Sequence, residues 1–190
     1  MMKWRNTKNT WGLLAILMHW LVAATIIGLF GLGLWMTGLD YYDPWYKQGP
    51  DIHRSIGILL LFLILLRLGW RLLEVIPSPH PNHKPWEVQA AHLAHLMLYL
   101  LPLLTMASGY LISTADGRAV SVFGWFEIPA IFTGLDKQEE LMGDIHEIVA
   151  WTLITTAAVH AAGALKHHLI DRDTTLTRML GKTANEETTR

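Results

Sequence analysis

Four of the ten histidines in this chain of 190 residues are spaced as two metal-binding pairs. His146 and His160 are fourteen residues apart, which is about 3.9 helical turns, so their imidazoles lie on nearly one face of a helix, roughly 21 Å apart along its axis. A histidine within an apolar helix is costly unless it has a partner or a ligand. The spacing therefore predicts two functional sites at two depths.

Two further histidines lie at matching depths on other apolar segments. His19 is near the start of the first apolar segment, at the depth of His160, while His53 follows an Asp-Ile dipeptide, as His146 does. We therefore predict the pairs His19/His160 and His53/His146. One imidazole on either side of an iron is what bis-histidine ligation of haem b requires, whereas zinc takes three or four ligands. A proton relay is the alternative, but it does not explain matched pairs.

Four apolar segments must position these histidines, at residues 11–36, 53–73, 90–112 and 146–168. The first has 26 residues without a formal charge, more than the ~20 that a helix needs to cross ~30 Å of hydrocarbon. The second segment is the weakest candidate for a membrane span, because only 12 uncharged residues separate Arg54 from Arg67. The long side chains of Arg67 and Arg71 can nevertheless extend to the membrane–water interface. The sequence predicts an all-α transmembrane four-helix bundle in a single domain, residues 1–190.

The connections carry local signals of their own. Asp51 and Asp144 are predicted helix N-caps, with Glu147 completing a capping box. The proline-rich segment 77–85 should be extended, and we expect His80 and His83 within it to be exposed and without a role. Residues 114–143 should form the largest loop, whose apolar patches would lie on the membrane or contact a partner.

The distribution of Lys and Arg predicts that both termini are cytoplasmic, because cytoplasmic connections carry the excess of positive charge. One side holds eleven: Lys3, Arg5, Lys8, Arg67, Arg71, Lys84, Lys166, Arg172, Arg178, Lys182 and Arg190. The other side holds four: Lys47, Arg54, Arg118 and Lys137. A net charge of −1 argues against binding to nucleic acid, and the absence of Cys excludes disulfides, iron–sulfur clusters and covalently attached haem.

Several motifs resemble those of the bacterial cytochrome b561 family. They are Met18-His19-Trp20-Leu21, Asp51-Ile52-His53-Arg54-Ser55-Ile56-Gly57, Ala91-His92-Leu93-Ala94-His95, His146-Glu147, Val159-His160-Ala161-Ala162 and Lys166-His167-His168. The resemblance implies a four-helix di-haem cytochrome of the bacterial inner membrane, related in helix layout to the cytochrome b subunits of formate dehydrogenases and nickel–iron hydrogenases. It also implies that His19 and His160 hold the inner haem b, and His53 and His146 the outer one.

A cationic, protonatable cluster is expected on the cytoplasmic side, as candidate ligands for a quinone or for haem propionates. Its members are Arg67, Arg71, His92, His95, Lys166, His167 and His168. Positive-inside charge that binds lipid headgroups is the alternative interpretation of such a cluster.

Three functions follow from these patterns. The first is electron transfer between a quinone pool, ubiquinone or another quinone, and a periplasmic donor or acceptor, with the direction of flow and the oligomeric state left open. The second, which the resemblance implies for some members of the family, is a superoxide:ubiquinone oxidoreductase; the ten acidic groups of the outer side disfavour it unless Arg118 or Lys137 attracts the anion. The third is a haem-free transporter or structural bundle, which predicts a colourless protein.

Overall fold

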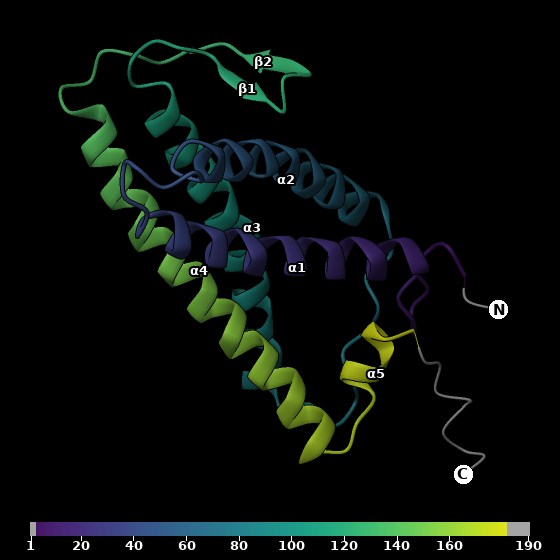
Figure 1. Ribbon diagram of the computed structural model, residues 1–190. Helices are drawn as coiled ribbons and strands as arrows, with labels where there is room; N and C mark the ends of the chain where they lie inside the picture. The colour runs from purple at the N-terminus through teal and green to yellow at the C-terminus, as the bar shows by residue number, and fades with distance from the viewer. Residues whose placement is uncertain (1–2, 182–190) are drawn as a thin grey trace.

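Four long helices dominate the computed structural model, which describes residues 3–181 (Figure 1). They are α1 (Leu13–Met36), α2 (Gln48–Leu73), α3 (Pro85–Ser113) and α4 (Gln138–Leu169). Each is long and apolar enough to cross a membrane, so the predicted transmembrane four-helix architecture is confirmed. Lys182 and Arg190, which entered the charge comparison, lie outside the described residues.

Three helices, α2, α3 and α4, begin earlier than their apolar segments, and the predicted caps of α2 and α4 are wrong. The N-cap positions of α2 and α4 are Lys47 and Lys137, so Asp51 and Asp144 lie inside the helices, and Glu147 completes no capping box with Asp144. The physical reason is that hydropathy marks only the lipid-facing part of each helix, whereas its polar first turns extend beyond that part. Within the first turn of α2, Asp51 instead pairs with Arg54 and complements the positive end of the helix dipole.

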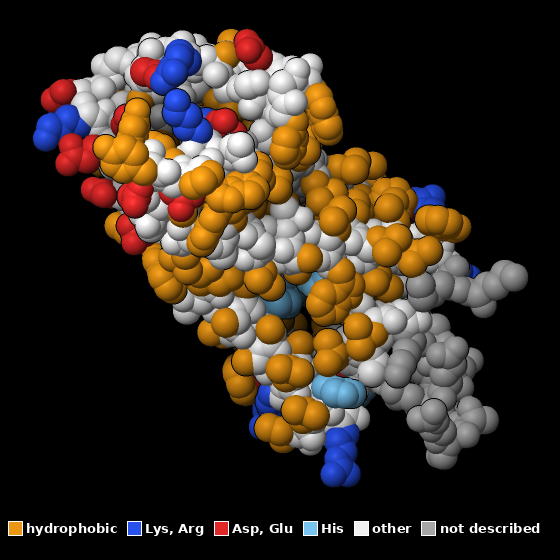
Figure 2. All heavy atoms as spheres, in the orientation of Figure 1, with side chains coloured by type: hydrophobic (Ala, Val, Ile, Leu, Met, Phe, Trp, Pro, Cys, Tyr) orange, Lys and Arg blue, Asp and Glu red, His pale blue; other side chains and the backbone are white. Residues whose placement is uncertain are grey.

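The helices form two pairs, α1 with α2 and α3 with α4, which cross each other at an angle (Figure 1). A small apolar core of Val22, Leu60 and Ile64 joins α1 to α2, and partly buried Tyr99 of α3 packs against it. Within the most apolar stretch of each long helix, only 6–17% of the residues are buried inside the protein. Figure 2 shows hydrophobic side chains exposed over the middle of the molecule. Such a surface suits lipid rather than water.

One end of the bundle, here called the hairpin end, carries a short antiparallel hairpin that the sequence did not predict. Its strands are β1 (Val120–Val122) and β2 (Phe126–Ile128). Val120 and Val122 are buried against Ile58 of α2, and the backbone N–H of Phe123 donates to Ser55 Oγ at 3.1 Å. Part of the expected 114–143 loop is therefore an ordered cap on α2.

The opposite end, here called the terminal end, gathers both ends of the described chain and the short helix α5 (Thr175–Met179) (Figure 1). The connection before α3 is extended, as predicted, and Pro85 becomes the first residue of that helix. The indole Nε1 of Trp20 donates to the carbonyl of Met179 at 2.8 Å, and Arg178 donates to the carbonyl of Ser78 at 3.2 Å. These bonds fasten α5 across the ends of α1 and the α2–α3 connection.

Candidate functional site

His53 of α2 and His146 of α4 face each other towards the hairpin end. Their ring centroids are 6.2 Å apart and their planes are inclined at 68°. His146 Nδ1 donates to the carbonyl of Thr105 at 2.8 Å, with Ser108 Oγ 3.2 Å from the same nitrogen. A proton held on Nδ1 leaves Nε2 with a free lone pair, which is the tautomer that binds a metal.

Two glycines make room for these rings. A Cβ on Gly109 of α3 would lie 3.0 Å from His146 Cε1, and one on Gly33 of α1 would lie 3.4 Å from His53 Cε1. Any larger residue at position 109 would press on the imidazole. His53 Nδ1 is buried and has no hydrogen-bond partner within residues 3–181. A buried polar atom left unpaired in this way points to a group absent from the protein chain itself.

His19 of α1 and His160 of α4 form the second pair, nearer the terminal end. Their ring centroids are 6.3 Å apart, with planes inclined at 66°. Arg67 Nη2 lies 2.9 Å from His19 Nδ1, and because guanidinium has no acceptor, the imidazole nitrogen must accept this bond. The neutral ring of His19 then carries its proton on Nε2. The ring of His95 lies 5.2 Å from that of His160.

The spacing of both pairs fits two trans imidazoles on one metal ion. With metal–nitrogen bonds of about 2.0–2.1 Å and about 1.1 Å from nitrogen to ring centre, the two centroids would be about 6.3 Å apart. The observed separations are 6.2 and 6.3 Å. Histidine side chains are visible in Figure 2 within a hollow between apolar side chains. The separation of the rings in each pair therefore matches that of two imidazoles bound to one metal ion.

The predicted cationic cluster divides into two groups. Arg67 and Arg71 lie over the ring of Tyr99, at 5.4 and 5.9 Å from its centroid, and Arg67 also contacts His19. Lys166 and His167 are instead engaged with acidic residues at the terminal end. His92 and His168 are exposed. The seven candidates therefore do not form one site.

Some residues that shape the two pairs were missed from the sequence. Thr105 acts through its backbone carbonyl, which no side-chain motif reveals. Ser108 and Gly109 do carry a signal, because a polar residue followed by glycine in the middle of an apolar helix often marks a close approach. The expectation that His80 and His83 are exposed is wrong, because both are partly buried and His83 contacts Asp173.

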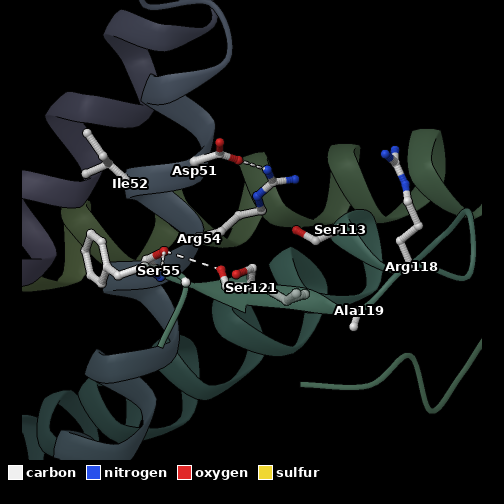
Figure 3. Close-up of a pocket in the computed structure, with 11 residues that line it drawn as sticks. Asp51, Ile52, Arg54, Ser55, Ser113, Arg118, Ala119 and Ser121 are labelled. Atoms are coloured by element: carbon white, nitrogen blue, oxygen red, sulfur yellow. Dashed lines mark hydrogen bonds and ion pairs between the residues drawn. The ribbon is translucent and has the colours of Figure 1, made fainter. Parts of the chain in front are cut away.

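A cavity of about 370 Å³ opens at the hairpin end (Figure 3). Its walls include Arg54 and Ser55 of α2, Ser113 of α3, and Arg118 and Ser121 of the hairpin region. The Arg54 guanidinium meets Asp51 (Figure 3), while Arg118 pairs with Asp116, and hydrogen bonds from Arg118 hold the pKa of that carboxyl below its ordinary value. The arginines are therefore partly neutralised.

Comparison with known proteins places this arrangement in a family. A sequence model described as prokaryotic cytochrome b561 matches residues 10–182. "Cytochrome b561 homolog 2" of Escherichia coli K12 is 45% identical over 185 residues, which covers 97% of this chain and 98% of that protein. "Probable superoxide oxidase CybB" of Yersinia pestis is 32% identical over 170 residues, covering 89% and 94% respectively. The chain therefore belongs to the prokaryotic cytochrome b561 family of membrane electron-transfer proteins, which implies haem b.

Proposed function

We propose that this protein holds two haem b groups, one between His19 and His160 and one between His53 and His146, and transfers electrons across the bacterial inner membrane. The observation that carries the proposal is the equal spacing of the two imidazole pairs, 6.3 and 6.2 Å between ring centroids, at two levels of one bundle. Fourteen residues of α4 separate the levels, or roughly 21 Å. Each bound haem would supply a one-electron iron couple.

The protein's own residues fix the ligands and limit access by water. The Thr105 carbonyl orients His146, Gly109 and Gly33 admit the rings, and the apolar helix surfaces exclude water from the bundle. Phe30 of α1 and Trp151 of α4 pack edge to face at 4.9 Å, joining the two helices between the levels. Such packing holds the two sites at a fixed separation, which a constant rate of electron transfer requires.

The quinone site belongs to the same proposal and lies on the cytoplasmic side, with both termini. Its components are Arg67, which contacts His19, His95, whose ring lies 5.2 Å from that of His160, and Arg71, which lies with Arg67 over Tyr99. These side chains can donate hydrogen bonds to a quinone carbonyl or to haem propionates. The other partner is a periplasmic donor or acceptor at the hairpin end. Lys166, His167, His92 and His168 are left out of this site because they are engaged with acidic residues or exposed.

Reduction by quinol in proteoliposomes tests the function. A short-chain ubiquinol or menaquinol should reduce the cytochrome, seen as growth of the b-type α-band, and a membrane-impermeant oxidant on the hairpin side should reverse it. Dithionite provides the control for total reducible haem. If dithionite reduces the protein and no quinol does, the quinone link is wrong even though the haem assignment stands.

Superoxide oxidation is the second candidate, because Arg54 and Arg118 line the cavity at the hairpin end and a relative bears the name of a probable superoxide oxidase. Cationic side chains in a recess can raise the local concentration of a small anion. Superoxide generated outside the vesicles should then reduce the protein, and Arg118→Ala should slow this several-fold and weaken its dependence on salt. A rate that is unaffected by superoxide dismutase would exclude superoxide as the donor.

A further inference from the structure

Three histidines converge at the terminal end, remote from the membrane pairs. His80 and His83 are brought together by a turn in which the His83 N–H donates to the His80 carbonyl at 3.1 Å, and their ring centroids are 5.6 Å apart. His167, in the last turn of α4, stacks on His83 with centroids 4.2 Å apart and planes inclined at 30°. The α2–α3 connection and the end of α4 thus present imidazoles to the same place.

A buried carboxylate lies at the centre of this cluster. Asp173 Oδ2 is 2.8 Å from His83 Nε2 and 3.2 Å from His167 Nδ1, and the Asp173 side chain is 4% exposed. The backbone N–H of Thr175 donates to Asp173 Oδ1 at 2.8 Å, which fixes the carboxylate with Oδ2 towards the two imidazoles. A carboxylate oxygen held in this way is available as a metal ligand.

Hydrogen bonds within the cluster do not use all of its imidazole nitrogens. His167 Nδ1 lies 2.7 Å from Asp171 Oδ2 and 3.2 Å from Asp173 Oδ2, so this imidazole is already engaged with carboxylates. His80 accepts only a long bond of 3.4 Å from the Asn82 N–H. The imidazole of His80 is therefore left with unused binding capacity.

The donor set and its spacing suit zinc. One ligand atom from each of His80, His83 and Asp173 lies within 4.8 Å of the other two. Tetrahedral zinc with bonds of about 2.0–2.1 Å holds its donor atoms about 3.3 Å apart, so the turn needs to close by about 1.5 Å at most. Two nitrogens and one oxygen without a thiolate fit Zn²⁺ better than Cu⁺. His167 stands next to the set as a possible fourth ligand.

A neighbouring group of possible ligands makes a useful contrast. Glu87, His167 and Asp171 also come together, but the ammonium of Lys166 lies 2.6 Å from both Glu87 Oε1 and Asp171 Oδ2. A cation already occupies that position between the carboxylates. Among the described residues, the His80, His83 and Asp173 set has no such ammonium contact.

We propose that His80, His83 and Asp173, with His167 adjacent, form a zinc site that clamps the terminal end of the bundle. The ion would join the α2–α3 connection to the segment between α4 and α5. That segment leads to Met179, whose carbonyl accepts the bond from Trp20, the residue after His19. The proposed zinc ligands belong to neither histidine pair, so a test of zinc binding is independent of the electron-transfer proposal.

The experiment uses the full chain with its bound cofactors, purified in detergent without a polyhistidine tag, treated with chelator and dialysed. Calorimetric titration with ZnCl₂ should give one tightly bound ion per chain, and zinc K-edge X-ray absorption should show nitrogen and oxygen neighbours with imidazole scattering at about 2.0 Å. His83→Ala and Asp173→Asn should weaken binding by at least about a hundredfold.

Two further variants keep the test decisive. His80→Ala removes a ligand that makes only the 3.4 Å contact, so it should weaken zinc binding while the visible spectrum and helix content stay unchanged. His168→Ala, next to His167 but exposed, should bind zinc as the natural chain does. The proposal is overturned if the natural chain binds no stoichiometric zinc, or if affinity survives in His80→Ala and His83→Ala. Dependence on His168 instead would identify surface binding and would equally overturn it.

Discussion

The two histidine pairs have nearly the same ring geometry but different surroundings. In both, centroids lie 6.2–6.3 Å apart with planes inclined by 66–68°. Around His53/His146, a backbone carbonyl accepts the Nδ1 proton of one ring and two glycines lie against the rings. Around His19/His160, an arginine donates to the Nδ1 of one ring and a third histidine adjoins the other.

The His53/His146 pair is therefore prearranged for metal binding on the His146 side, whereas the His19/His160 pair must first rearrange. His146 already has Nε2 free, whereas His19 holds its proton on Nε2 for as long as Arg67 donates to Nδ1. Binding of a metal by His19 therefore requires Arg67 to move, which frees a guanidinium for an anionic group such as a propionate. It also leaves positive charge near that site, and positive charge favours the reduced form of a haem. We expect the His19/His160 site to have the higher potential.

Removal of a single ligand should have the largest effect. His53→Ala or His146→Ala should lower the haem content from about two to about one per chain and leave the component of higher potential, because each pair is proposed to hold its own iron. His19→Ala or His160→Ala should leave the haem component of lower potential. Pyridine haemochrome assays with redox titration measure both quantities. Loss of both haems from correctly folded variants, or of neither, would break the assignment of pairs.

Removal of the arginine charge should act on one site only. Arg67→Met should lower the potential of the His19/His160 component by roughly 30–60 mV, where about 59 mV corresponds to a tenfold change for one electron. Arg71→Met is the matched control, since Arg71 contacts Tyr99 at 5.9 Å but donates no hydrogen bond to His19. Its shift should be smaller. Equal shifts of both components in Arg67→Met would contradict a local effect.

The glycines offer a finer comparison within the other site. Gly109→Ala places a Cβ 3.0 Å from His146 Cε1 and should broaden or shift the low-spin signal of the His53/His146 component in electron paramagnetic resonance. Gly33→Ala places its Cβ 3.4 Å from His53, an ordinary contact, and should change little. A larger change in Gly33→Ala would show that the ring of His53 is the more tightly confined.

The smallest effect is expected from Ser108→Ala. Its hydroxyl lies 3.2 Å from His146 Nδ1, but that nitrogen already donates to Thr105 at 2.8 Å, so removing the hydroxyl leaves the principal bond in place. The potential of the His53/His146 component should shift by less than about 20 mV, a factor of roughly two. A loss of that haem would mean that Ser108, rather than the carbonyl, orients the ring.

The sequence carried the features that depend on spacing along a helix. His146 and His160 lie on one apolar helix, and the partners at matching depths, His53 and His19, do meet them. Features that depend on backbone groups or tertiary turns were not accessible: the Thr105 carbonyl, the hairpin at 120–128 and the contact of His83 with Asp173. Hydropathy also misplaced the starts of α2 and α4, because their first turns are polar.

The ratio of haem to protein, with reduced-minus-oxidised spectra, is the most direct test of the central claim. Detergent-purified protein should contain about two haems per chain, with low-spin b-type bands and two one-electron components, because each histidine pair is proposed to bind one iron. A ratio of one would leave one of the two equally spaced pairs without a role. A colourless protein would contradict electron transfer and favour a transporter or a structural bundle.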